Sequence, residues 1–102
     1  MKKTKYTVRL LRAAEDDLND MITYIAAENR TAAEMMATKI ERNLSRLSFY
    51  PYRGEVPKDK ELKHLGYRFL VTGNYLIFYT IEERTILIHR IVHGARDYLN
   101  LL

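Results

Sequence analysis

The sequence lacks cysteine altogether and is poor in proline and glycine, with two and four of them in 102 residues. Without cysteine the chain can form neither disulfides nor thiolate metal sites, and it has no cysteine nucleophile. This composition suits a reducing compartment, so we expect a cytoplasmic protein. The four glycines stand at positions 54, 66, 73 and 94, too far apart for a phosphate-binding glycine loop.

Long apolar runs are missing as well. No hydrophobic stretch approaches the roughly 20 residues that cross a bilayer. The first five residues, Met1 to Lys5, include three lysines, but the apolar segment and cleavage site of a signal peptide do not follow them. We therefore expect neither a membrane span nor a signal peptide, and no membrane partner.

Lysine and arginine outnumber the acidic residues by 17 to 13, which gives a formal net charge of +4. A positive excess suits an acidic partner, either nucleic acid or a protein that neutralises the surface, although ordinary basic proteins carry it too. At 102 residues, without repeats or a flexible linker, the chain has the length of one domain. We expect a single domain over residues 1–102.

Apolar periodicity predicts a strand followed by a helix. Alternation from Tyr6 to Leu11 is typical of a short strand. From Ala13 the period becomes helical. Glu15–Asp17 are expected in the first turn of this helix, where the helix dipole favours carboxylates. The apolar residues on one face of the helix are Ala14, Leu18, Met21, Ile22 and Ile25.

A second helix is predicted after Asn29 and Arg30, which interrupt the pattern. Thr31 offers an N-cap, and Glu34 completes a Thr-x-x-Glu capping box. The helix should end before Pro51, because the residue ahead of a proline avoids the α region. Two helices joined so closely should form an antiparallel hairpin. The apolar face of the second helix comprises Met36, Ile40, Leu44 and Leu47.

The second half of the chain is predicted to form a loop and three strands. Pro51 to Gly66 holds both prolines and mixed charges, and we expect an ordered but irregular loop. Strands are predicted at Tyr67–Val71, Tyr75–Ile81 and Thr85–Val92, with turns short enough for hairpins. Early helices followed by strands indicate an α+β fold. We expect an N-terminal strand, an antiparallel helical hairpin packed on one face of a small antiparallel sheet that the first strand joins, and a short C-terminal tail.

The residues that could carry chemistry are cationic and aromatic. His89 and His93 would lie about 13 Å apart on one face of a strand, too far to share a metal, so we expect no metal and no cofactor. Arginine clamps phosphates, and histidine or tyrosine can act as a general acid or base. The candidates for a metal-free ribonuclease site, which a meander of strands could bring towards one surface, are Arg68, Arg90, His93, Arg96 and Tyr98. The candidates for binding nucleic acid or another target are Arg53, Lys58, Lys60 and Lys63.

Each of these assignments has a structural alternative. Arg68 and Arg90 could face solvent or form ion pairs with Glu55 and Asp97. Arg96 and Asp97 could brace the tail against the sheet, and the lysines of the loop could form a solvated face with the acidic residues around them. Three tyrosines suit the core of the sheet better than catalysis, namely Tyr67, Tyr75 and Tyr79.

Four segments together resemble the RelE/ParE toxin superfamily. No single segment is as specific as a metal-ligand signature, but their combination, in this order and at this length, is specific. The resemblance extends to the two helices and the order of the elements, and it implies a RelE-like fold. The segments are Pro51–Gly54, Leu65–Val71, Asn74–Tyr79 and Ile88–Tyr98.

The resemblance implies a type II toxin, of the kind associated with plasmid stabilization. A cognate antitoxin holds such a toxin inactive in a toxin–antitoxin hetero-oligomer, by wrapping an extended or helical segment around it. An exposed amphipathic groove would suit that contact. The superfamily has two kinds of target, and both lead to growth arrest. RelE-like members cleave mRNA in the ribosomal A site, whereas ParE-like members bind DNA gyrase and perform no chemistry of their own.

One position separates the two kinds of target. RelE-like nucleases carry an arginine in the central strand, where this sequence has Leu76. Arg68 and Arg96 match basic positions of the nucleases, and Arg90, which is expected close by, could supply the missing arginine. The His93–Asp97 segment is more similar to the tails of ParE-like proteins. We therefore expect a gyrase inhibitor, with a ribosome-dependent mRNA endoribonuclease as the alternative.

Overall fold

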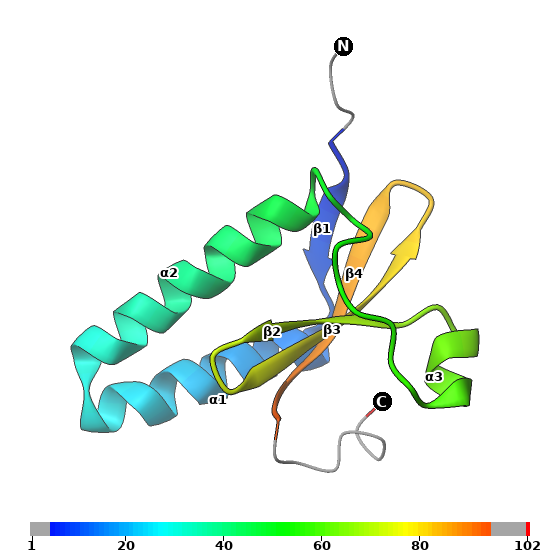
Figure 1. The fold of residues 1–102 in the computed structure, drawn as a ribbon. Coiled ribbons are helices and arrows are strands. Elements are labelled where there is room, and N and C mark those ends of the chain that lie inside the picture. The colour runs from blue at the N-terminus through cyan, green and yellow to red at the C-terminus, as the bar shows by residue number, and fades with distance from the viewer. Residues whose placement is uncertain (1–4, 95–101) are drawn as a thin grey trace.

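The computed structural model describes residues 5–94 and 102, and this part of the chain forms a four-stranded sheet and three helices (Figure 1). The α+β fold, with its N-terminal strand and helical hairpin, is confirmed. The elements in chain order are β1 (Thr7–Leu10), α1 (Arg12–Glu28), α2 (Arg30–Leu47), α3 (Lys60–His64), β2 (Arg68–Thr72), β3 (Tyr75–Glu82) and β4 (Thr85–His93).

The strands lie in the order β1-β4-β3-β2. The pairs β4–β3 and β3–β2 are antiparallel, as hairpins require. The first strand joins the sheet as predicted, but it pairs with β4 in parallel, with Leu10 opposite Ile88. The sheet is therefore mixed rather than wholly antiparallel. The long connection between β1 and β4, which contains the helices and the strands β2 and β3, makes the parallel pairing possible.

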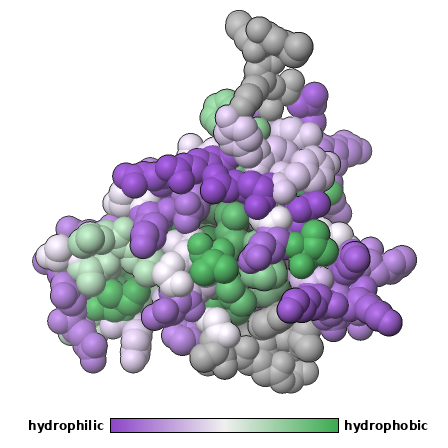
Figure 2. Space-filling model, in the orientation of Figure 1, coloured by the Kyte–Doolittle hydropathy of each residue, from purple (hydrophilic) through white to green (hydrophobic). Residues whose placement is uncertain are grey.

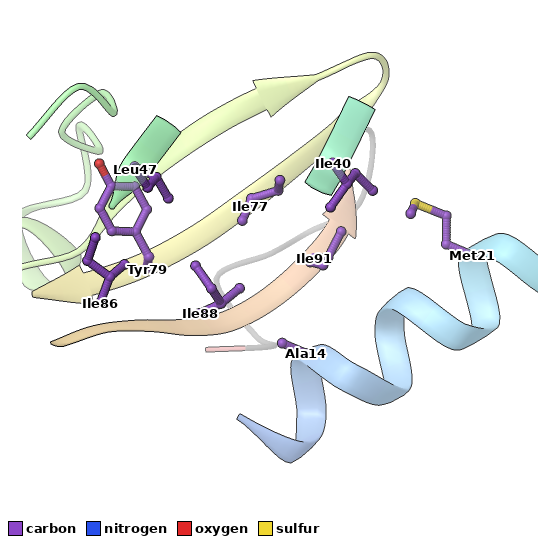
Figure 3. Packing of buried hydrophobic residues seen from close by; sticks show 9 residues of the cluster. All are labelled: Ala14, Met21, Ile40, Leu47, Ile77, Tyr79, Ile86, Ile88 and Ile91. Atoms are coloured by element: carbon purple, nitrogen blue, oxygen red, sulfur yellow. The ribbon is translucent and has the colours of Figure 1, made fainter. Parts of the chain in front are cut away.

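The core lies between the sheet and the helical hairpin. Figure 3 shows side chains from α1, α2, β3 and β4 converging in this space. Each fully buried aliphatic side chain contributes roughly 1.5–3 kcal/mol to the free energy of unfolding. The residues of this cluster are Ala14, Met21, Ile40, Leu47, Ile77, Tyr79, Ile86, Ile88 and Ile91.

The pairing of β3 with β4 is interrupted by a β-bulge. Phe78 lies opposite Arg90, whereas Tyr79 lies opposite Ile88, so His89 is the extra residue on β4. The bulge shifts the alternation of the strand by one residue. Ile88 and Ile91, three positions apart, therefore both enter the core cluster.

The beginning of α2 differs from the prediction. Asn29 is the N-cap, and its side-chain oxygen accepts a hydrogen bond from the Ala32 backbone N–H at 3.0 Å. Thr31 lies inside the helix, so the predicted Thr31–Glu34 capping box is wrong. Asn29 already has the extended backbone of a cap, with φ −154° and ψ 101°, because it also ends α1, and asparagine caps at least as well as threonine.

The segment from Pro51 to Gly66 was predicted to be irregular, but it contains the five-residue helix α3. Asp59 is its N-cap and accepts hydrogen bonds from the backbone N–H groups of Glu61 and Leu62. Leu62 is buried and anchors the helix. A helix this short has too few turns to show a period in the sequence. None of the helices in residues 5–94 is long and apolar enough to cross a membrane.

Candidate functional site

Arg90 on β4 is held by a carboxylate of α1. Its Nε and Nη2 donate to the two carboxylate oxygens of Asp17 at 2.6 and 2.8 Å. The side chains of Arg90 and Asp17 are only 22 and 15 % exposed. Hydrogen bonding to Asp17 raises the pKa of Arg90 above its ordinary value, against the opposing effect of burial. The guanidinium is thus fixed and its charge is neutralised within the fold.

The position of Asp17 follows from where β1 ends. β1 pairs with β4 only as far as Ile88, whose carbonyl accepts from the Leu11 N–H at 2.9 Å. Beyond that point the Ile91 N–H donates to Asp17 Oδ2 at 2.9 Å instead of to a strand. A buried N–H needs a hydrogen-bond acceptor. At this edge of β4 the Asp17 carboxylate is that acceptor, in place of the carbonyl of a neighbouring strand. Asp17 was predicted to lie in the first turn of α1. It lies in the second turn, because the helix begins at Arg12.

Arg68, the first residue of β2, is held by backbone carbonyls. Its Nη1 donates to the oxygens of Tyr52 and Gly54 at 3.1 and 3.0 Å. Its Cζ lies 5.2 Å from the centre of the Tyr52 ring, a cation–π distance. The predicted ion pair with Glu55 is not formed; Glu55 instead exchanges two backbone hydrogen bonds with Phe69. Asp97, the predicted partner of Arg90, lies outside the described residues.

Tyr79 on β3 holds the same loop from inside the core. Its hydroxyl donates to the Pro51 carbonyl at 2.8 Å and accepts from the Gly54 N–H at 2.9 Å. Burial raises the pKa of Tyr79, while the Gly54 hydrogen bond and the nearby charges of Arg68 and Arg53 lower it. The prediction that Tyr79 belongs to the core is confirmed, since its side chain is fully buried. Its structural role explains why the Pro51–Gly54 segment has a defined shape.

The register separates the two arginines that were expected to converge. Arg68 lies opposite Tyr79, and Arg90 lies opposite Phe78. Successive side chains of a strand point to opposite faces, so Arg68 leaves the sheet on the face of Tyr79 and Arg90 on the other. The register therefore does not direct Arg68 and Arg90 towards one surface, and the tail residues of the same expectation, Arg96 and Tyr98, lie outside the described residues.

The other predicted site residues are scattered. His93 ends β4, and its ring contacts Tyr75 edge-on at 5.4 Å. Arg53 is exposed in the loop after α2. Arg96 and Tyr98 lie outside the described residues. Three exposed lysines line the segment around α3, interspersed with acidic residues: Lys58, Lys60 and Lys63.

One polar cluster was missed by the sequence analysis. Both ring nitrogens of His89 are hydrogen-bonded, Nδ1 to the Tyr67 hydroxyl at 3.2 Å and Nε2 to the Thr80 hydroxyl at 2.8 Å. Burial lowers the pKa of His89, and the charge of Glu82 opposes this. These side chains line a depression of about 440 Å³. The cluster depends on the bulge at His89, which has no sequence signature.

Comparison with known proteins identifies the family. The family described as ParE toxin of type II toxin-antitoxin system, parDE, matches residues 8–98. The chain belongs to the ParE toxin family. The resemblance to the RelE/ParE superfamily is thereby confirmed, and the protein is a type II toxin–antitoxin toxin. No curated protein sequence gives a significant match.

Solved structures share the fold of this ParE-family toxin. One, from the chromosomal ParDE TA system of P. aeruginosa, has a TM-score of 0.72 at 16 % identity and covers 88 % of this chain and 97 % of its own. Another, from the toxin–antitoxin complex RelBE2 of Mycobacterium tuberculosis, has a TM-score of 0.65 at 29 % identity and covers 93 % and 98 %. At 16 % identity the first shows the fold alone.

The position that distinguishes RelE-like nucleases is apolar in this ParE-family toxin. Leu76 pairs with Val92 across β3 and β4. By strand alternation it shares its face with Phe78, which is fully buried, as Val92 nearly is. The surroundings of Leu76 are therefore those of a packing residue.

Proposed function

We propose that this toxin arrests growth by binding DNA gyrase in the cytoplasm and that it catalyses no reaction of its own. The observation that supports this most is the way its two candidate catalytic arginines are used. Stabilising a transferring phosphoryl group needs cationic donors aimed at one point. Nε and Nη2 of Arg90 are bound to Asp17, and Nη1 of Arg68 is bound to two carbonyls. They also leave the sheet on opposite faces.

Two assays performed side by side test this proposal. Purified toxin should inhibit the supercoiling of relaxed plasmid by gyrase, and it should leave mRNA intact in the presence of ribosomes. Toxin mixed beforehand with excess antitoxin is the control and should inhibit nothing. Ribosome-dependent cleavage without inhibition of gyrase would reject the proposal in favour of the endoribonuclease, and Arg68→Ala or Arg90→Ala should then abolish cleavage.

We also propose that a cognate antitoxin neutralises the toxin by lying along β1. This strand is an edge of the sheet, and the N–H groups of Val8 and Leu10 point away from β4, because those of Thr7 and Leu11 bond in the direction of β4. A groove of about 620 Å³ separates this edge from α2. Its apolar lining includes Tyr6, Val8, Leu10 and Leu44. An unpaired edge beside an apolar groove suits the addition of a strand. The related structures come from toxin–antitoxin systems.

A bulky side chain in the groove tests this docking site. Ser45 is exposed on α2 and lines the groove, so Ser45→Arg should weaken binding of the neighbouring gene's antitoxin at least about tenfold, a loss of about 1.4 kcal/mol. Thr23→Arg makes a comparable change at an exposed position of α1 outside the groove, and it should bind as the wild type does. Titration calorimetry measures both. Equal affinity of the two variants would place the antitoxin elsewhere.

A further inference from the structure

Exposed aromatic side chains gather in the loop that Arg68 and Tyr79 hold. The described part of the chain exposes eight large hydrophobic side chains, and four of them lie within residues 49–56. Tyr50 and Tyr52 are 52 and 62 % exposed. In the orientation of Figure 2, other apolar surface lies over β2, where Val71 is exposed. In this loop, exposed aromatic rings stand next to an exposed arginine, Arg53.

The loop presents these rings in a defined geometry. Its carbonyls at Pro51, Tyr52 and Gly54 are bound by the Tyr79 hydroxyl or by Arg68. The Gly54 N–H is bound as well, and Glu55 is joined to β2 by two backbone hydrogen bonds. Little conformational entropy therefore remains to be lost when a partner binds, which favours affinity.

The same surface carries positive charge. The Arg68 guanidinium lies over the Tyr52 ring, and Arg53 is exposed beside it. Neither arginine forms an ion pair within residues 5–94. Arg53 stands between Tyr52, whose ring Arg68 covers, and Gly54, whose carbonyl Arg68 binds, so the two arginines lie at the same loop. Aromatic rings and uncompensated cations thus share one surface.

We propose that this aromatic–arginine surface, formed by Tyr50, Tyr52, Arg53 and Arg68, binds a short stretch of single-stranded DNA. Unpaired bases stack on tyrosine rings, and arginines contact the phosphates between them. Arg68 already stacks on Tyr52, so a base adds a layer to an existing stack. In a duplex the base faces are hidden inside the stack, and only the cations would contribute. The choice of DNA rests on the proposed gyrase function, because the target enzyme works on DNA.

Binding of labelled oligonucleotides to the purified toxin tests the proposal. Fluorescence anisotropy should show that an oligo-dT strand binds more tightly than a duplex of equal length. Tyr52→Ala should weaken oligo-dT binding about tenfold or more, as loss of a stacked base does, and Tyr52→Phe should restore it because the ring is kept. With about three phosphates contacted, binding should fall roughly 20-fold between about 50 and 200 mM salt.

Matched variants distinguish specific binding at this surface from nonspecific binding elsewhere on the protein. Tyr24 on α1 is 71 % exposed and lies outside the loop, so Tyr24→Ala should bind oligo-dT as the wild type does. Circular dichroism melts confirm that each variant is folded.

The proposal is overturned if the wild type prefers duplex, if it binds oligo-U but not oligo-dT, or if Tyr24→Ala and Tyr52→Ala lose the same affinity. It is also overturned if Tyr52→Ala abolishes gyrase inhibition while oligo-dT is never bound, because the surface would then contact protein. Oligo-dT binding without gyrase inhibition would reject the gyrase proposal alone.

Discussion

Arg90 and Arg68 lie on the two strands that flank β3, yet their side chains have different roles in the fold. Arg90 meets a carboxylate and is mostly buried, so its charge is cancelled inside the protein. Arg68 meets two neutral carbonyls and an aromatic ring, so it orders a loop while keeping its charge. An arginine's availability to a partner depends on whether its contact is charged or merely polar.

The difference extends to the segments that each arginine holds. Asp17 and Arg90 join α1 to β4 at the edge where β1 has ended, and they close that edge. Arg68 and Tyr79 hold a loop whose rings remain in solvent. We therefore expect substitutions at the Asp17–Arg90 contact to act mainly on stability. Substitutions at the contacts of Arg68 with the loop should act on both stability and binding.

The largest effect should come from breaking the Arg90 contact. Asp17→Ala leaves a mostly buried guanidinium and the Ile91 N–H without their acceptor, and it should lower the free energy of unfolding by about 3 kcal/mol. Urea denaturation measures this. Asp16→Ala is the matched control, because Asp16 is 63 % exposed and its ion pair with Arg12 is at 3.8 Å; its effect should stay below about 0.5 kcal/mol. Equal losses in the two variants would contradict a structural role for Asp17.

A smaller loss is expected from crowding the Arg68 contact. A Cβ on Gly54 would lie 2.5 Å from the Tyr79 hydroxyl oxygen and 2.9 Å from the Phe69 carbonyl oxygen. Gly54→Ala should therefore lower the free energy of unfolding by about 2 kcal/mol, the scale of overpacking. Gly66→Ala meets nothing within 4 Å and suffers only from its φ of +86°, a strain of about 1 kcal/mol. A larger loss at Gly66 than at Gly54 would refute the steric explanation.

Removing Arg68 itself should have an intermediate effect on stability. Arg68→Ala loses two charge-assisted hydrogen bonds at a half-buried site, and we expect a loss of about 1.5 kcal/mol. Arg68→Lys should recover only part of this, because lysine lacks the planar group that bonds and stacks at once. Thermal melts can be compared with those of Arg9→Ala, an exposed arginine on β1, which should be nearly neutral. A neutral Arg68→Ala would mean that Tyr79 alone orders the loop.

The smallest expected effect is a pH dependence at His89, the bulge residue next to Arg90 in β4. The folded pKa of His89 lies below its ordinary value of 6.5 because of burial. The unfolded chain therefore takes up the proton first, and stability should fall as the pH drops below about 6.5 and through the folded pKa. His89→Gln should flatten this acid slope, while His64→Gln, at an exposed position of α3, should leave it in place. An unchanged slope in His89→Gln would assign it to other groups.

The elements that could be predicted are those with a repeating pattern. The three later strands were located to within one residue at each end, and the helical faces built around Ala14, Met21, Ile40 and Leu47 are buried as expected. Burial of alternate or helically spaced residues is a local signal that reports its own element. The N-cap at Asn29 and the short helix α3 were missed, because neither depends on a period.

The candidate site was less predictable because its contacts join distant segments. The sequence identified Arg68 and Arg90 as notable and suggested that each could be a structural residue, but Glu55 is not the partner of Arg68, and Asp17 was not recognised as a partner of Arg90. Asp17 and Arg90 are 73 residues apart, and the Tyr79 hydroxyl reaches a loop 25 to 28 residues away. Such pairs are set by strand register and by a one-residue bulge, which leave no trace in composition or spacing.

Residue type and local order determined four properties of this protein from the sequence alone. These are the absence of cysteine, the modest positive charge, the helical and strand periods, and the family resemblance. Whether an arginine remains available to a partner was decided only by the tertiary structure. Arg68 and Arg90 are chemically identical side chains on strands of one sheet, and the register gave one of them a carboxylate and the other two carbonyls and a ring. Burial beside a fixed opposite charge neutralises a guanidinium, whereas neutral acceptors only orient it.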